Sequence, residues 1–73
     1  MAKKEKEAVY RVTDVIGTSS ESWEAAARAA VNTASKSLRD LRIAEITKLD
    51  VRIENGKVSQ FRARVSLSFK YEA

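Results

Sequence analysis

The chain has 73 residues, enough for one domain, and carries 14 basic against 10 acidic side chains, for a net charge of +4. It contains no cysteine and no histidine, which excludes disulfides, thiolate metal sites and histidine general bases. A domain of this size buries only about 60% of the surface of its unfolded chain, so its core is marginal. Self-association is the remaining way to gain stability.

The first seven residues form a polar leader in which lysines alternate with glutamates, and we expect a single domain over residues 8–73. The leader lacks the apolar stretch of a signal peptide, and no run of the sequence approaches the roughly 20 apolar residues of a membrane span. We therefore expect a cytoplasmic protein without a membrane partner. The basic residues are neither concentrated nor interleaved with aromatics, which argues against a nucleic-acid partner.

Residues 9–16 are rich in β-branched types and predict a first strand, which we expect Gly17 to end. Three hydroxyl residues follow, and Thr18, Ser19 and Ser20 are all possible helix caps. Thr18 and Glu21 have the spacing of a capping box. We favour Ser20, because it places Glu21 in the first turn, where the helix dipole favours an acid.

A helix is predicted from Glu21 to about Leu38. Its apolar residues recur in steps of three and four and form one stripe: Trp23, Ala26, Ala27, Ala30, Val31, Ala34 and Leu38. Most of the stripe is alanine, so the helix axis can approach its packing partner closely. On the outer face we expect an ion pair between Glu24 and Arg28, one turn apart.

Residues 42–54 and 57–71 predict a second and a third strand joined by a tight turn at Asn55-Gly56. In the third strand apolar residues alternate with polar ones, as in an antiparallel strand with one buried face. The chain is therefore predicted to be an α+β domain with the order strand, helix, strand, strand. One helix cannot cover both faces of three long strands, so apolar surface is left for self-association.

The predicted hairpin contains a conflict of phase. A regular two-residue turn at Asn55-Gly56 places Leu49 beside Arg62, and the apolar faces of the two strands no longer coincide. A three-residue loop, a β-bulge or burial of both faces in an assembly would each resolve it. We expect one of these irregularities between residues 44 and 66.

No constellation of catalytic residues is present, and we expect no enzymatic activity. The two glycines are far apart, so there is no glycine-rich phosphate loop. Standard zinc ligands are missing. Carboxylates such as Glu45 or Asp50 from neighbouring subunits could combine into a cation site, but ordinary surface pairing of these charges is the simpler interpretation, and the metal sites stay undetermined.

Several segments, in this order and spacing, resemble the dodecin family over about residues 8–71: Tyr10-Arg11-Val12, Val15-Ile16-Gly17-Thr18-Ser19, Ser22-Trp23-Glu24-Ala25-Ala26, Leu38-Arg39-Asp40-Leu41-Arg42, Asn55-Gly56-Lys57-Val58 and Val65-Ser66-Leu67-Ser68-Phe69. The resemblance implies a β-α-β-β subunit whose three-stranded antiparallel sheet wraps around one helix. It also implies a hollow shell of twelve subunits that binds and stores small ligands, flavins in the best-known members.

Flavin-binding dodecins share a tryptophan at the start of the second strand and a glutamine 19 residues later. The matching positions here are Ile43 and Arg62, and only Glu45 fits the pattern around the tryptophan. These three residues are the predicted ligand-binding positions. Since the stacking and hydrogen-bonding groups are replaced, we expect flavin binding to be weak or absent. Arg62 either attracts an anion or pairs with Glu45 or Asp50.

Three functions follow from the sequence. The first is a non-enzymatic, homododecameric protein that binds or stores a small ligand. The second is a structural shell that traps a metal cation or small anion at its subunit interfaces. The third, least supported by the charge pattern, is a basic nucleic-acid-binding module.

Overall fold

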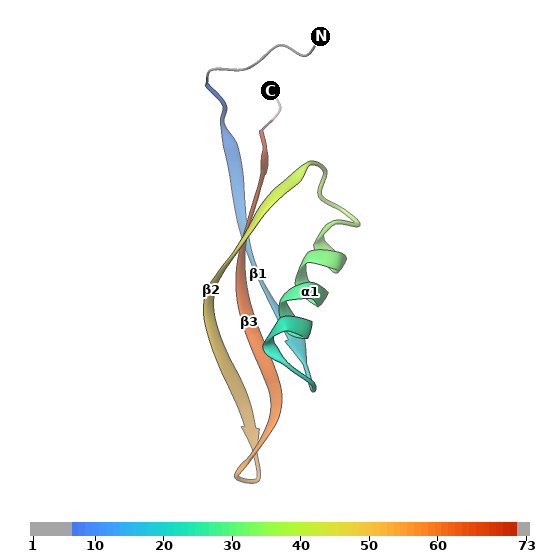
Figure 1. The fold of residues 1–73 in the computed structure, drawn as a ribbon, viewed down its shortest axis with the longest axis vertical. Coiled ribbons are helices and arrows are strands. Elements are labelled where there is room, and N and C mark those ends of the chain that lie inside the picture. Colours follow the sequence, from blue (N-terminus) through green and yellow to red (C-terminus); the bar gives the residue numbers. More distant parts are fainter. Residues whose placement is uncertain (1–6, 72–73) are drawn as a thin grey trace.

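A computed structural model describes residues 7–71 as one helix packed on one sheet (Figure 1). The elements are β1 (Tyr10–Ser19), α1 (Trp23–Ala34), β2 (Leu41–Glu54) and β3 (Lys57–Lys70). The β-α-β-β order expected from the sequence is confirmed. β3 is the central strand and pairs antiparallel with both β1 and β2. The predicted leader lies outside the described residues apart from Glu7.

The core lies between α1 and the β1–β3 half of the sheet. Five apolar residues are fully or almost fully buried, two from the helix and three from the central strand: Ala26, Ala30, Ala63, Val65 and Leu67. The helix reaches β2 only marginally. As a result the inner face of β2, on the helix side of the sheet, is largely uncovered, and the subunit is elongated at 56 × 19 × 19 Å.

Gly17 does not end the first strand, contrary to the prediction. It lies inside β1 and pairs with Ala63. A Cβ placed on Gly17 would overlap the carbonyl oxygen of Ala26 and lie 2.9 Å from the Cβ of Ala30. The glycine therefore serves the close approach of α1 to the strand, which is the other common reason for glycine inside a strand.

The helix starts two residues later than predicted. The strand conformation continues to Ser19, which still pairs with Phe61, and the Ser19 hydroxyl accepts a hydrogen bond from the Glu21 amide at 3.0 Å. Ser22 rather than Ser20 is the cap, and its hydroxyl accepts from the Ala25 amide at 3.0 Å. Pairing in the sheet thus decides which of the hydroxyl residues begins the helix.

The helix also ends earlier than predicted, at Ala34 rather than near Leu38. The Ser35 hydroxyl donates to the Asn32 carbonyl at 3.0 Å, and the Ser37 hydroxyl donates to the Ala34 carbonyl at 3.4 Å. Serines that bond to nearby carbonyls favour turns over continued helix. Leu38 nevertheless packs against the core, as the apolar stripe predicted.

The turn at Asn55-Gly56 is confirmed as a two-residue turn, with positive φ angles of 53° and 74°. The predicted irregularity is confirmed as well, because β-bulges interrupt the β2–β3 pairing. At one bulge Ser59 is extra, so that Val58 pairs with Ile53 and Phe61 pairs with Val51. This shift restores the phase of the two apolar faces.

A second bulge leaves Thr47 unpaired between Ile46 and Lys48. The extra residue bonds across to the neighbouring strand through its hydroxyl, since Thr47 Oγ1 donates to the Arg64 carbonyl at 3.3 Å. Ser59 does the same at the first bulge, where its hydroxyl donates to the Arg52 carbonyl at 3.3 Å. A third shift, at Arg42, lies near the start of β2.

Candidate functional site

The three predicted ligand positions lie on the outer face of the sheet, opposite α1. Ile43 pairs with Ser68, Glu45 with Ser66, and Arg62 with Asp50. Residues next to these on β3, Leu67 and Ala63, point into the core. Because successive side chains in a strand alternate between the two faces, the three candidates all face away from the helix.

Within one subunit the structure brings two of the three candidates together. Ile43 and Glu45 are two residues apart on β2, and both are exposed, with Ile43 58% accessible. Arg62 lies six residues along β3 from Ser68, the partner of Ile43, which corresponds to about 20 Å. A single small ligand can therefore contact Arg62 together with Ile43 only where subunits meet.

Arg62 is engaged by a carboxylate of its own chain. Its Nε donates to Asp50 Oδ1 at 2.8 Å, and its Nη2 donates to Oδ2 at 3.3 Å, while both side chains stay half-exposed. Of the two interpretations of Arg62, the geometry is that of pairing with Asp50. Hydrogen bonding from Arg62, reinforced by its charge, holds the pKa of Asp50 below its usual value and raises the pKa of Arg62.

Trp23 contacts both strands beside this ion pair, a role that the sequence did not indicate. Its indole Nε1 donates to the Asp50 carbonyl at 3.0 Å, and its ring meets Phe61 edge to face with centroids 5.1 Å apart. The first residue of α1 is thereby fixed to both strands of the hairpin. A lone tryptophan at a helix start does not predict these contacts. They depend on where the sheet places Asp50 and Phe61, which follow 27 and 38 residues later in the chain.

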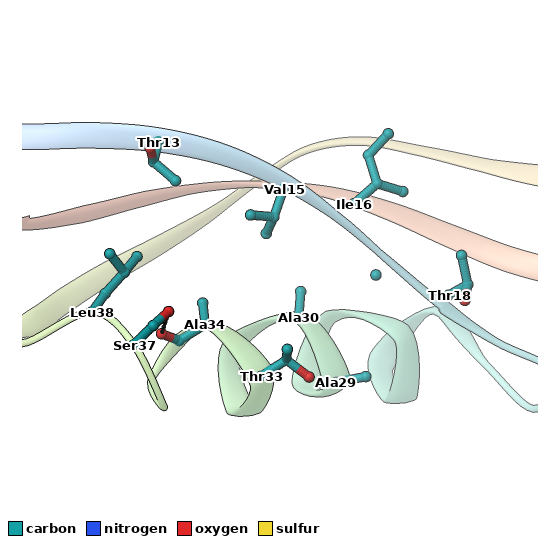
Figure 2. A pocket seen from close by; sticks show the side chains of 11 residues that line it. Thr13, Val15, Ile16, Thr18, Ala29, Ala30, Thr33, Ala34, Ser37 and Leu38 are labelled. Atoms are coloured by element: carbon teal, nitrogen blue, oxygen red, sulfur yellow. Dashed lines mark hydrogen bonds between the residues drawn. The ribbon is translucent and has the colours of Figure 1, made fainter.

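A groove that sequence reasoning missed runs between β1 and α1. Figure 2 shows Val15 pointing from β1 towards Ala30 and Ala34 of α1, while Ile16 points away from the helix. The groove has a volume of about 530 Å³, and its lining includes Thr13 and Thr33. Small side chains on the helix leave this space open along the flank of the core.

The described part of the chain, residues 7–71, holds no group of three or more acidic side chains close enough to bind a metal ion. The sequence-predicted cation site was placed between subunits, so one subunit does not test it. None of the helical structure in residues 7–71 has the length and apolarity of a membrane-spanning helix.

The fold and the arrangement of its elements match those of known proteins. A sequence model of the dodecin family matches residues 9–72, almost the whole chain. The chain belongs to the dodecin family. The resemblance inferred from the sequence is thus confirmed, together with the fold that it implied.

Individual dodecins are similar over most of their length. Calcium dodecin from Mycobacterium tuberculosis is 40% identical over 62 residues, which is 85% of this chain and 87% of the relative. Its crystal structure, described as that of a calcium-chelating antigen with a novel calcium-binding site, superposes with a TM-score of 0.79 at 41% identity, over 89% of this chain and 93% of that one.

Dodecin from Streptomyces coelicolor superposes with a TM-score of 0.87 at 38% identity and covers 94% of this chain and 99% of that one. Dodecin from Streptomyces davaonensis gives a TM-score of 0.84 at 28% identity, over 93% and 100% of the two chains. The overall fold of one helix packed on a three-stranded sheet is therefore shared with these dodecins.

Proposed function

We propose that this dodecin is a non-enzymatic protein that binds or stores a small ligand as a homododecamer. The observation that carries the proposal is the amount of apolar surface left exposed by one subunit. Among residues 7–71 only five apolar side chains are buried in the core, while large apolar side chains are exposed on both faces of the sheet, among them Val12, Ile16, Ile43, Ile46 and Leu49. So many exposed large apolar side chains on so small a domain favour protein–protein contact.

We further propose that flavin is bound weakly or not at all. Ile43 offers no aromatic face for stacking, a contribution of about 0.5–1.5 kcal/mol beyond buried area. The guanidinium of Arg62 is already engaged by Asp50, so a ligand group that needs a hydrogen bond there would lose about 1–3 kcal/mol. Together these losses correspond to two or more orders of magnitude in affinity.

Native mass spectrometry tests the first proposal, because it reports stoichiometry and retained ligands at once. We expect a particle of about twelve times the 8.1 kDa subunit mass, with any bound small molecule visible as an adduct. A monomer at micromolar concentration would contradict the assembly. A dodecamer that never carries an adduct, even after incubation with candidate ligands, would favour the purely structural shell.

Titration of riboflavin fluorescence tests the flavin proposal. The unmodified protein should leave riboflavin mostly unquenched at micromolar concentration. The double variant Ile43→Trp/Arg62→Gln should quench it, because it supplies an aromatic face and an uncharged hydrogen-bonding group at the two family positions. FMN should be titrated alongside, since the charge of Arg62 attracts a phosphate. Tight quenching by the unmodified protein would contradict the proposal.

A cation is the second candidate ligand, supported by the similarity to calcium dodecin. The carboxylates offered by the outer face include Glu45, which is exposed and forms no ion pair within residues 7–71. Calorimetric titration of the assembled protein with Ca²⁺ should then give saturable heat that Glu45→Gln removes. Identical titrations of the two proteins would exclude Glu45 as a ligand.

The cytoplasmic location expected from the sequence stays a prediction.

A further inference from the structure

The bulge at Thr47 places Lys48 on the outer face of the sheet. Glu45 lies on this face, so regular alternation along β2 would put Lys48 on the helix side. The extra residue shifts the pairing by one, and Lys48 pairs with Arg64 instead. Arg64 is on the outer face, because the next residue of β3, Val65, is buried under α1. Bulges commonly re-aim a side chain in this way.

Lys48 and Arg64 are like charges that lie directly opposite each other, and we call them the basic pair. Cross-strand partners have Cβ atoms about 4.5–5.5 Å apart, and like charges in this position destabilise a sheet. On its other side Arg64 pairs with Ile16 of β1, which carries no charge. Both basic side chains are exposed, and neither takes part in an ion pair within residues 7–71.

Two other arginines of the outer face are already paired. Arg62 is held by Asp50, and Arg52 contacts Glu54 at 3.1 Å. The pKa of Asp50 is lowered by the hydrogen bond from Arg62 and further by the charges of Arg62 and of the basic pair, so both bases lie within electrostatic reach of this carboxylate. The basic pair, rather than Arg62, is therefore the part of this face that is available to an anion.

Two carboxylates of the outer face lie one row away from the basic pair. Asp14 and Glu45 both pair with Ser66, the next outer-face residue of β3 after Arg64. They are diagonal to Arg64, at about 7–8 Å, rather than directly opposite to it. Neither forms an ion pair with the basic pair among the contacts of residues 7–71. These carboxylates are the groups with which an external anion has to compete.

A tetrahedral oxyanion suits the basic pair better than a carboxylate does. A guanidinium donates two parallel hydrogen bonds to two oxygens, and the neighbouring ammonium needs a further acceptor. A phosphate group supplies about three strong acceptor oxygens and carries about −1.5 to −2 charges at neutral pH. Its charge thus matches that of the two bases, and it leaves an oxygen for each of them.

We propose that Lys48 and Arg64 hold a phosphate-like tetrahedral oxyanion on the outer face of each subunit. The ion relieves the repulsion between the two like charges. Its source is either the free ion or the phosphate group of a small organic molecule. This inference rests on the proposed ligand-binding function and names the chemical group that the outer face takes. Because both side chains are exposed, inorganic phosphate alone should bind with about millimolar affinity.

Calorimetric titration of the assembled protein with inorganic phosphate, at constant ionic strength, tests the site. Lys48→Gln and Arg64→Gln should each weaken binding about tenfold, which corresponds to the loss of one charge-assisted hydrogen bond. Arg52→Gln is the matched control, because it removes the same charge from the same face at an arginine that is paired with Glu54. Equal losses in all three variants would overturn the proposal, since they would indicate only general attraction to a basic protein.

Urea unfolding gives a second readout. In phosphate-free buffer Lys48→Gln should be more stable than the unmodified protein, because the repulsion is gone. Phosphate should then raise the midpoints of the unmodified protein and of Arg52→Gln more than that of Lys48→Gln, since only the first two retain the bound ion. The general stabilisation by phosphate, through its exclusion from protein surfaces, is common to all three proteins. Equal shifts would overturn the proposal, and so would a Lys48→Gln variant that is less stable without phosphate.

Glycerol phosphate and glycerol distinguish the two sources of the ion. Tighter binding of glycerol phosphate than of inorganic phosphate would identify a phosphorylated small molecule as the ligand, and weaker binding would identify the free ion. Glycerol that binds as tightly as its phosphate would contradict the oxyanion chemistry. Light scattering of the same samples separates the two levels of inference. A dodecamer that does not bind phosphate refutes only this site, whereas a monomer refutes the proposed assembly.

Discussion

Gly17 has no room for a side chain, and this sets how closely the helix lies on the sheet. The Ala26 carbonyl is backbone and cannot rotate away from an added methyl group. We expect Gly17→Ala to lower the free energy of unfolding by at least about 1–3 kcal/mol, the usual cost of overpacking. Urea unfolding followed by circular dichroism measures this change.

Gly56 provides the control, because it has open space around it and a positive φ of 74°. Gly56→Asn should cost little, since asparagine tolerates this conformation, whereas Gly56→Ala should cost about 1–2 kcal/mol from backbone strain alone. Equal stability of Gly17→Ala and the unmodified protein would show that α1 can shift outward without loss.

The Asp50–Arg62 ion pair leads to a prediction about the titration of the Asp50 carboxyl at acidic pH. Arg62 lowers the pKa of Asp50, so the pair contributes stability above the unfolded-state pKa of about 3.9 and loses it as pH falls through the lower folded-state value. Arg62→Gln should move the pKa of Asp50 up towards its usual value. Carbon-13 NMR of the Asp50 carboxyl measures this directly. An unchanged Asp50 titration would mean that the pair does not form in solution.

At the scale of elements, the start of α1 distinguishes Ser20, the cap favoured by the sequence pattern, from Ser22, the cap in the structure. Ser22 bonds to the Ala25 amide, whereas Ser20 lies two residues before the cap. Ser22→Ala should therefore cost about 1 kcal/mol of stability, the usual contribution of a helix cap. Ser20→Ala should change the free energy of unfolding, measured by urea unfolding, by only about a few tenths of 1 kcal/mol. A larger loss of stability for Ser20→Ala than for Ser22→Ala would show that Ser20 is the cap, as the sequence pattern predicts.

The hairpin shows what a sequence pattern can and cannot predict. Asn55-Gly56 identifies the turn, because few residues adopt two successive positive φ angles. The clash of apolar phases shows that some irregularity must exist. Its place at Ser59 does not follow from local propensity, because the register that buries Ala63 and Val65 under α1 decides it.

The same limit explains two of the local errors, the end of the first strand and the start of the helix. Gly17 and the hydroxyl residues after it carry turn signals, but their structure is decided by pairing with Ala63 and Phe61 on a strand more than forty residues later. Long-range pairing of this kind is invisible in a local window. The order of the elements and the alternation of β3 were predictable because they depend on periodicity alone.

At the scale of the whole molecule, the sequence predicts some features of the candidate site, whereas others required the structure. The family resemblance identified Ile43, Glu45 and Arg62, and the strand alternation that puts them on one face follows from their register. The distance of Arg62 from the other two, and its engagement by Asp50, required the structure. What the three residues do together depends on how subunits are placed, which the sequence of one subunit specifies only through its exposed surfaces.

The small core makes a last prediction about folding and assembly. Within residues 7–71 five apolar side chains are buried, three of them alanine, and this is too little apolar burial to stabilise the subunit alone. Subunit contacts should therefore supply much of the stability, and unfolding should depend on protein concentration. For a dodecamer that unfolds to separate chains, a hundredfold increase in concentration stabilises each subunit by about 2.5 kcal/mol. Equilibrium urea unfolding curves measured at about 1 µM and about 100 µM protein should therefore have clearly different midpoints. Superimposable curves would show that the isolated subunit is stable, and would leave its exposed isoleucines and valines without the role in assembly proposed for them.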